Sequence, residues 1–339
     1  LQNNMTTENK SVIAEWYTGK SIFITGGSGF MGKVLVEKLL YSCNGIKHIY
    51  ILMRSKRGKN PVTRIEEMWT LPVTTLKLEA NLKDAVEQNV AGTVRIIDLA
   101  KKINNLLVFV HFSTAFCSSD IEVFEEKVYD CRDNPRDVIE VAKWMKLDPL
   151  EVATPSIIAP HPNTYTYSKR LAEKVVADEV DNMPVCIIRP SIVCPAALEP
   201  LPGWVDSLNG PMGLLVGAGK GVIRSMHAKA ENKAQVVPVD IAINAAIVIA
   251  QRVGSGTIKS KEVPVYNLTQ DEVVPITMGE VLNKGRAIVY DNPFEGQIWY
   301  PDGDLRSSKL VHNIYCILLH WLPAYFIDLL LFIFRYKTL

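Results

Sequence analysis

Hydrophobic and polar positions change period several times along the first part of the chain. A short β-rich run, Ser21–Thr25, ends directly in glycine-rich sequence. The next segment, Gly29–Leu40, spaces its apolar residues as one face of a helix requires, and Lys47–Met53 then has the pattern of a second buried strand. A strand, a glycine-rich turn, a helix and another strand within about 30 residues predict a βαβ unit.

The same alternation continues toward the C-terminus. We expect helices over Asn81–Asn104 and Thr164–Asp181, and strands over Leu106–Phe112 and Val185–Ile188. Asp240 has the right chemistry and place to be the N-cap of a later apolar helix. Strands that alternate with helices predict an α/β fold, a Rossmann-like doubly wound parallel sheet with helices on both faces.

A long apolar run near the C-terminus follows neither pattern. Ile314–Phe334 is 21 residues long, and Asp328 is its only formally charged residue. A helix of about 20 residues crosses a bilayer, and Trp321 and Tyr325 suit a membrane interface. Pro323 and Asp328 count against full spanning. We therefore predict membrane association, with the first helix of a further domain as the alternative.

Composition and charge narrow the classes of protein. Of 339 residues, 48% are hydrophobic and 22% are charged, which predicts a globular chain with a substantial core. The 37 Lys and Arg nearly balance the 36 Asp and Glu, so we expect no nucleic-acid partner. The six cysteines form no C-x-x-C pair, which argues against a disulfide framework and against a metal site.

The glycine-rich turn after the first strand carries the clearest chemical signal. Thr25–Gly32 reads TGGSGFMG and precedes a predicted helix. Glycines at such a turn let the backbone approach a pyrophosphate at the helix N-terminus. The predicted cofactor-binding residues here are Gly26, Gly29, Phe30, Met31 and Gly32. The alternative is a tight turn that binds nothing.

The end of the second strand indicates which dinucleotide is bound. A site selective for NAD places Asp or Glu about 20 residues beyond the glycines, where it binds the ribose 2′-hydroxyl. Here Arg54 stands at that distance and Lys56 follows it. Cations suit a 2′-phosphate, so these residues favour NADPH; a solvated basic turn is the alternative.

Two residues on one predicted helix face form a candidate proton-transfer pair. Tyr165 and Lys169 are four residues apart, which places both on the same face. An ammonium group beside a phenol would lower the phenol pKa from about 10. Such a pair can exchange a proton with a carbonyl oxygen during hydride transfer. Tyr167 is a competing tyrosine that lacks the four-residue spacing.

Hydroxyl side chains follow the predicted strand Leu106–Phe112. Ser113 and Thr114 stand where ligands bind in open parallel sheets, beyond the carboxyl ends of the strands. We expect one of these hydroxyls to bond the reacting carbonyl, and we favour Thr114 over Ser113. A local turn stabilised by a hydroxyl is the alternative.

Taken together, the motifs TGGSGFMG, VHFSTAF and PNTYTYSKRLAEKV resemble those of the extended short-chain dehydrogenases/reductases. More narrowly, with IRPSIV and EPLPGWVDSLNGP, the chain resembles the alcohol-forming fatty acyl-CoA reductases over nearly its whole length. The resemblance implies reduction of a long-chain acyl-CoA to the primary alcohol through an aldehyde, with two NADPH. It also implies an intracellular membrane, endoplasmic reticulum or peroxisome, with the catalytic domain facing the cytosol.

The resemblance assigns roles to individual residues. Tyr165 is the acid, Lys169 lowers its pKa and holds the ribose, and Thr114 orients the carbonyl. Pro190 and Ser191 are expected near the nicotinamide.

The chain departs from that family between two of its motifs. Lys56–Ala80 provides 25 residues where the family has two further βα units, so about 60 residues are expected to be missing. The family's C-terminal domain is also expected to be absent. Two alternatives to an active reductase remain: a catalytically impaired splice or gene-model variant that acts as a non-catalytic, membrane-associated dinucleotide-fold protein, and a sterol or nucleotide-sugar dehydrogenase.

These observations predict four parts of the chain. They are a polar N-terminal segment, 1–18; an NADPH-binding Rossmann-like domain, 19–190, with an internal deletion near 56–80; a substrate-binding lobe, 191–305; and an apolar membrane-associating segment, 306–339.

Overall fold

The computed structural model describes residues 11–53, 80–206, 208, 210–258, 260–269 and 274–334. The chain divides into two compact units. The first comprises Leu1–Asp206 and Val237–Thr269, and the second comprises Ser207–Val236 and Gln270–Leu339.

The first unit begins with the predicted βαβ unit. Its elements are α1 (Val12–Tyr17), β1 (Ser21–Thr25), α2 (Phe30–Ser42) and β2 (His48–Leu52). β1 and β2 pair in parallel from Ser21↔His48 to Thr25↔Leu52. Ile24, Val34 and Leu39 are buried here against α10 (Val239–Gly254), which supplies Ile243 and Ile247 to the same core. The predicted βαβ unit is therefore confirmed.

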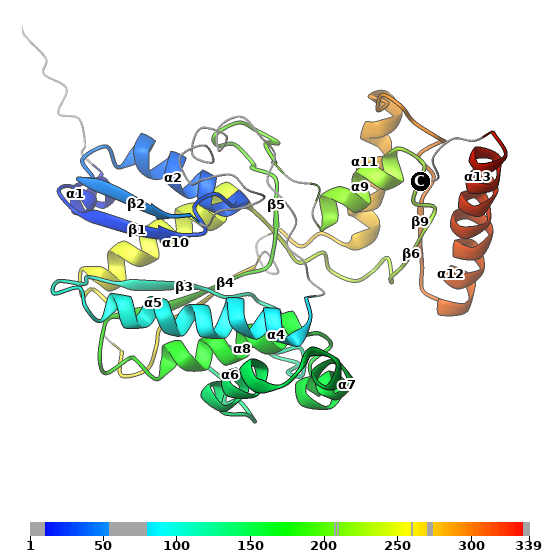
Figure 1. Ribbon diagram of the computed structural model, residues 1–339. Coiled ribbons are helices and arrows are strands. Elements are labelled where there is room, and N and C mark those ends of the chain that lie inside the picture. The colour runs from blue at the N-terminus through cyan, green and yellow to red at the C-terminus, as the bar shows by residue number, and fades with distance from the viewer. Residues whose placement is uncertain are drawn as a thin grey trace, which may run out of the picture. The chain divides into compact units, whose positions relative to one another are not determined.

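A second parallel sheet holds the centre of the same unit. Its strands are β3 (Phe109–Phe112), β4 (Val185–Pro190) and β8 (Val265–Leu268), in the order β3-β4-β8. Every residue of β4 is buried, as expected of a central strand with helices on both faces. Ile187 packs toward the cluster that includes α8 (Thr164–Ala177), whereas Ile188 packs toward α10 (Figure 1). The sheet is thus doubly wound.

Three helical segments on one face form the predicted long helix. They are α4 (Leu82–Ala85), η1 (Val86–Ala91) and α5 (Gly92–Ala100), and η1 is a turn of π-helix. The Asn81 side chain caps the start by accepting a hydrogen bond from the Asp84 amide. Two further helices, α6 (Pro135–Trp144) and α7 (Leu147–Ile158), contribute to the same apolar core.

The expected N-cap role of Asp240 is wrong. α10 begins at Val239, so Asp240 lies inside its first turn. The Asp240 carboxylate instead accepts hydrogen bonds from three backbone amides of another segment, those of Ala197, Leu198 and Glu199, at 2.9, 2.9 and 3.1 Å. It therefore holds a loop against the helix rather than starting the helix.

The described strands do not join into one continuous sheet. β1 and β2 form one parallel pair and β3, β4 and β8 form another sheet, with no hydrogen-bonded ladder between β1 and β3 among these strands. A short pairing of β5 (Ile192–Cys194) with β7 (Val236–Pro238) follows the second sheet. The Rossmann-like architecture is present but divided in two.

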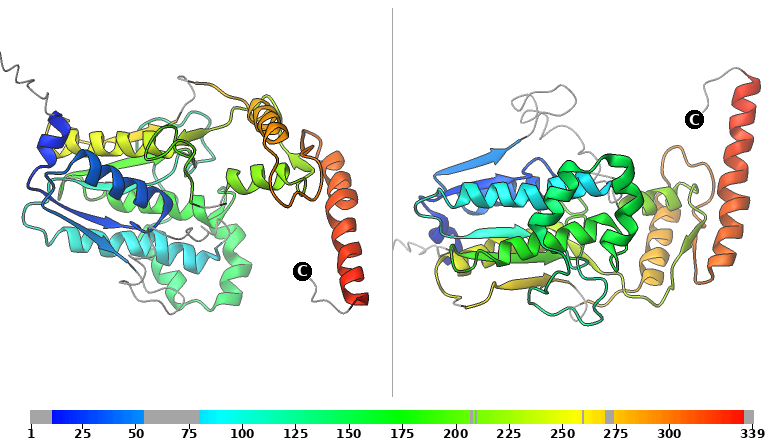
Figure 2. Two further views of the ribbon diagram at one scale, coloured as in Figure 1. Left: turned by 90° about the horizontal axis from the view of Figure 1, so that it is seen from above. Right: turned by 60° about the horizontal axis from the view of Figure 1, so that its bottom comes forward.

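The second unit consists of short elements and one long helix. Its elements are α9 (Pro211–Gly219), β6 (Ser225–His227), α11 (Met278–Asp291), β9 (Asp304–Arg306), α12 (Lys309–Cys316), η2 (Ile317–Trp321) and α13 (Leu322–Ile333). β6 pairs in parallel with β9. The last three run as one rod of 25 residues, Lys309–Ile333 (Figure 2). This helix is long and apolar enough to cross a membrane, and its most apolar stretch is not buried within the protein.

Candidate active site

The glycine turn between β1 and α2 has the geometry that a bound phosphate requires. Gly26 adopts a φ of 69°, a conformation that side chains with a Cβ rarely adopt. A Cβ at Gly32 would lie 2.3 Å from the Gly26 carbonyl oxygen, so only glycine lets the first turn of α2 pack on the loop. Gly29 closes the turn by donating its amide to that same oxygen at 2.9 Å.

The residues around these glycines are packed in place. Phe30 and Met31 open α2 and lie against the core beneath it, and the Phe30 ring stacks on Trp204 at 5.7 Å. Sequence reasoning missed Gly27. A Cβ there would meet the Ile51 side chain at 2.6 Å, so this glycine allows the turn to approach β2.

The carboxyl ends of β3 and β4 bring three predicted hydroxyl residues to one edge. Ser113 and Thr114 follow β3, and Ser191 follows β4, whose last residue is Pro190. The hydroxyl oxygens of Ser113 and Ser191 are buried and have no hydrogen-bond partner in the described part of the chain. Buried hydroxyls normally have partners, so this pair is suited to a polar ligand.

The structure brings Tyr165, Lys169 and Thr114 together. Tyr165 lies in the first turn of α8, close enough to Thr114 for that side chain to lower the pKa of the phenol. Lys169 lies one turn further along, with Nζ 5.9 Å from the centre of the Tyr165 ring. The Lys169 ammonium donates to the Phe112 carbonyl at 3.0 Å, directly at the end of β3. Thr114 rather than Ser113 is therefore the hydroxyl paired with the candidate acid.

The electrostatic environment of this pair differs from the sequence expectation. Burial raises the pKa of Tyr165, and the Thr114 side chain opposes that change. Burial lowers the pKa of Lys169, while the nearby Glu173 carboxylate opposes that change. The pKa of Tyr165 is thus raised rather than lowered, because the effect of burial outweighs that of Thr114.

The hydroxyl of the competing tyrosine, Tyr167, is bound to a group outside the candidate site. Tyr167 is buried, and its hydroxyl donates to Asp133 at 2.8 Å. Burial and the Asp133 carboxylate both raise the Tyr167 pKa. A phenol held against a carboxylate in this way is a structural hydrogen-bond donor, which leaves Tyr165 as the candidate acid.

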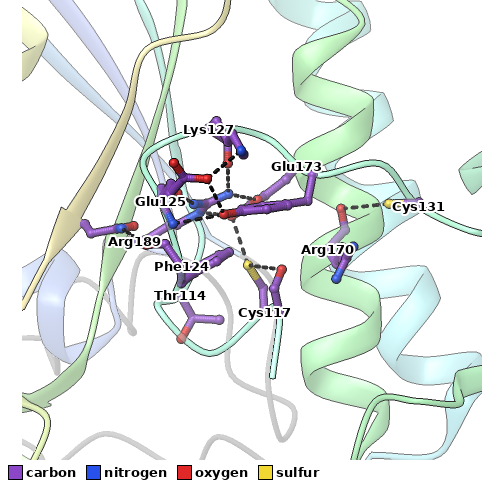
Figure 3. Close-up of polar contacts among 12 residues, drawn as sticks. Thr114, Cys117, Phe124, Glu125, Lys127, Cys131, Arg170, Glu173 and Arg189 are labelled. Carbon is purple, nitrogen blue, oxygen red and sulfur yellow. Dashed lines mark hydrogen bonds and ion pairs between the residues drawn. The ribbon is translucent and has the colours of Figure 1, made fainter. Parts of the chain in front are cut away.

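A buried ion pair beside the site was missed by sequence reasoning. Glu173 of α8 binds Arg189 of β4 through two hydrogen bonds, of 2.8 and 2.6 Å (Figure 3). The only sequence signals are a charged residue inside a strand that otherwise has a core pattern and an acid four residues beyond Lys169. Arg54 and Lys56, which carried the choice of NADPH, lie outside the described residues.

These features fit a dinucleotide. The residues from Gly26 to Gly32 offer a backbone without Cβ atoms at a helix N-terminus, which suits a pyrophosphate. The unpartnered hydroxyls of Ser113 and Ser191 offer polar contacts beyond the strand ends, where ligands bind in such sheets. With the tyrosine–lysine pair beside them, fold and site define an NAD(P)-binding oxidoreductase with a Rossmann-like fold.

Comparison with known proteins identifies the family. An NAD-binding family model described as male sterility protein matches residues 24–78 and 72–246. Fatty acyl-CoA reductase 1 of Xenopus laevis and of Homo sapiens is each 34% identical, over 94% of this chain and 71% of the relative. Fatty acyl-CoA reductase wat of Drosophila melanogaster is 32% identical over 97% of this chain and 72% of its own length. The chain belongs to the fatty acyl-CoA reductase family.

Solved structures agree with the fold. A thiolation-reductase di-domain of an archaeal non-ribosomal peptide synthetase superimposes with a TM-score of 0.54 at 14% identity, over 93% of this chain and 88% of the other. UDP-glucuronic acid 4-epimerase of Bacillus cereus, in complex with NAD, gives 0.52 at 12% identity, over 80% and 84% of the two chains. At such identities the likeness shows the fold alone, so the nucleotide-sugar alternative gains nothing from it.

The comparisons also bear on the expected missing internal segment. The alignment with the Xenopus relative runs over 367 columns but covers 94% of 339 residues, about 319, so about 48 columns face a gap in this chain. The family model matches in two pieces that meet within residues 72–78. These figures agree with a chain that lacks an internal segment, and the place of the deletion near 56–80 stays a prediction.

Proposed function

We propose that this protein reduces long-chain fatty acyl-CoA to the primary fatty alcohol, through the aldehyde, with NADPH as the reductant. The observation that carries the proposal is the grouping of Tyr165 with Lys169 and Thr114 at the carboxyl end of β3, where Lys169 Nζ lies 5.9 Å from the Tyr165 ring centre and donates to the Phe112 carbonyl. Membership in the fatty acyl-CoA reductase family supports the substrate class. The balance is one acyl-CoA, two NADPH and two protons to one alcohol, free CoA and two NADP⁺.

Each residue has a defined task in this proposal. Bound NADPH supplies the hydride. The Tyr165 hydroxyl donates its proton to the oxygen of the carbonyl as negative charge develops there, and Thr114 orients both groups. The Lys169 ammonium lies close enough to stabilise the phenolate that remains, and it holds the ribose.

Two further parts of the proposal concern the cofactor and the membrane. The cations Arg54 and Lys56 support NADPH over NADH, because they suit a 2′-phosphate. The exposed apolar helix Lys309–Ile333 supports association with a membrane. An intracellular membrane with the catalytic unit facing the cytosol is the part of the proposal that the family resemblance implies. The endoplasmic reticulum and the peroxisome are the membranes that the family resemblance implies.

The test of the reaction compares two tyrosine variants. NADPH oxidation and alcohol formation are followed with palmitoyl-CoA for the wild-type chain, Tyr165→Phe and Tyr167→Phe. We expect Tyr165→Phe to lower kcat by about 10²–10⁴-fold, the usual contribution of a general acid. The matched control Tyr167→Phe removes the hydrogen bond to Asp133 and leaves turnover intact. Normal turnover by folded Tyr165→Phe contradicts the mechanism.

One observation favours a second candidate, a non-catalytic membrane-associated protein with an incomplete dinucleotide fold. β1 and β3 share no ladder, and relatives carry about 48 alignment columns that this chain lacks. An interrupted sheet weakens the crevice that the two sheets would share around a dinucleotide. NADPH binding by the chain itself separates the two candidates.

A further inference from the structure

Glu173 and Arg189 form the most completely buried ion pair among the described residues, and Glu173 lies on the same helix as Tyr165 and Lys169. Arg189 and Glu173 are 0% and 1% exposed, and the guanidinium binds both carboxylate oxygens (Figure 3). Removing two charges from water costs as much as their attraction returns, so a buried ion pair adds little net stability compared with apolar residues of similar size. Stability alone therefore does not account for this ion pair, so the groups that it holds together are the relevant feature.

Arg189 uses its remaining donors to hold one loop. Its guanidinium donates to the carbonyls of Glu125 and Lys127 at 3.1 and 2.8 Å, and it lies 4.1 Å from the Phe124 ring centre. The Cys117 thiol also donates to Glu173, at 3.2 Å. The segment from Cys117 to Lys127 is thus fastened at both ends to the Glu173–Arg189 pair.

Both ends of this cluster adjoin the proposed catalytic groups. Glu173 stands one helical turn beyond Lys169 on α8, so the two share a helix face. Cys117 follows Thr114 by three residues on the loop after β3. A shift of the Glu173–Arg189 pair would therefore move α8 and the Thr114 loop relative to each other, and with them Tyr165 and Thr114.

We propose that Glu173 and Arg189 are positioning residues for the reaction: they fix α8 against the loop after β3 so that Tyr165 lies beside Thr114. This inference rests on the proposed function. The ionisable groups around Lys169 are Tyr165 and Glu173 on α8, His111 on β3, Cys117 on the loop and Arg189 on β4. Among them, the Glu173 carboxylate raises the pKa of Lys169 against the effect of burial.

The test uses the full chain and three substitutions. Glu173→Gln removes the carboxylate charge, and Cys117→Val removes only the thiol bond to Glu173. Glu179→Gln is the matched control, because Glu179 pairs with Lys101 at 2.7 Å just beyond α8 and contacts no proposed catalytic group. Steady-state kinetics with NADPH and palmitoyl-CoA, pH profiles of kcat, and hydrogen exchange of residues 114–127 are measured for each.

We expect Glu173→Gln to lower kcat at least tenfold while both KM values stay within about twofold. The basic limb of its pH profile should move to lower pH, because Lys169 loses its proton more easily without the carboxylate. Cys117→Val should show a smaller fall in kcat and faster exchange over residues 114–127, and Glu179→Gln should show neither. If Glu173→Gln does not fold, Glu173→Leu combined with Arg189→Met removes both charges and takes its place.

Two outcomes separate this inference from the function on which it rests. If Tyr165→Phe is inactive but Glu173→Gln has the wild-type kcat and pH profile, the positioning role is overturned and the proposed function stands. If the wild-type chain does not turn over, the proposed function fails, and exchange over residues 114–127 decides whether the pair fixes the loop. Exchange unchanged by Cys117→Val and Glu173→Gln then overturns the positioning role too.

Discussion

Single side chains at the end of β3 determine which protonation states the site offers. Because burial raises the pKa of Tyr165, the phenol is protonated at neutral pH, which is the state a reductase needs in its acid. His111, within β3 near this end, is half-buried, and burial lowers its pKa to about 3. Lys169 is therefore the cation that a developing phenolate meets.

The hydroxyl that pairs with Tyr165 is the first residue-scale prediction. Thr114→Val keeps the shape of the side chain but removes its hydrogen bond, so we expect kcat to fall by about 10²-fold. Ser113→Ala removes a hydroxyl with no partner in the described structure, so it should weaken NADPH binding more than it lowers kcat. Steady-state kinetics of both variants are the measurement, and the opposite ranking of the two kcat values contradicts the assignment.

Asp240 gives a prediction about stability and pH. Burial alone would raise the pKa of Asp240, but backbone hydrogen bonds from Ala197, Leu198 and Glu199 outweigh it and lower the pKa. The group therefore stabilises the fold at pH values above the unfolded-state pKa, and this stability is lost as pH falls through the lower, folded-state pKa.

We expect Asp240→Asn to lower the free energy of unfolding by about 1–3 kcal/mol at pH 7, with a smaller difference at pH 3. Urea unfolding at the two pH values measures this. The exposed Asp98 provides the control variant Asp98→Asn, which should match wild type at both. A penalty for Asp240→Asn that does not depend on pH contradicts the account.

At the scale of elements, a comparison of two glycines distinguishes the effect of backbone strain from the effect of ligand contact at the turn between β1 and α2. Gly26 and Gly256 both have positive φ, 69° and 70°, and a Cβ at either would meet no other atom within 4 Å. Each Gly→Ala substitution should therefore cost about 1–2 kcal/mol of stability. Only Gly26→Ala should also weaken NADPH binding, which fluorescence titration measures. Equal NADPH affinities in the two variants contradict a pyrophosphate site at the turn.

Local pattern predicted the strands and helices that carry the site but not elements such as α6, α7 and α11, and it gave no information about long-range pairing. The helical period found α8, and with it the Tyr165–Lys169 spacing, because both depend on residues within a few turns. The partner of Glu173 is Arg189 on another element, and the three amides bound by Asp240 lie about 40 residues earlier. The spacing of hydrophobic residues carries no information about contacts between distant segments. The division of the sheet between β1 and β3 could not be predicted from it either.

At the scale of the whole molecule, the proposed membrane association depends on the helix Lys309–Ile333. Its mean hydropathy is 2.0, and Leu318 and Leu322 near its middle are 55% and 56% exposed. Leu318→Lys with Leu322→Lys should release the protein from liposomes in a flotation assay, since each charge costs about 2.5–3.5 kcal/mol inside a membrane. The control Val152→Lys, at a position 83% exposed on α7, should float like wild type. Flotation of the double variant contradicts membrane association through this helix.

The divided sheet makes cofactor binding the central question for the whole molecule. The turn at Gly26 and the hydroxyls beyond β3 and β4 lie on two sheets that share no ladder, although both features fit a dinucleotide. A reductase requires both sheets to hold the same NADPH. The non-catalytic alternative requires that they do not.

The most direct test is a fluorescence titration of the unaltered chain with NADPH, with circular dichroism to establish that it is folded. The account predicts saturable binding of one NADPH per chain, weakened by Gly26→Ala and unaffected by Gly256→Ala. A folded chain that shows no saturable binding of NADPH would contradict the reductase and leave the non-catalytic protein.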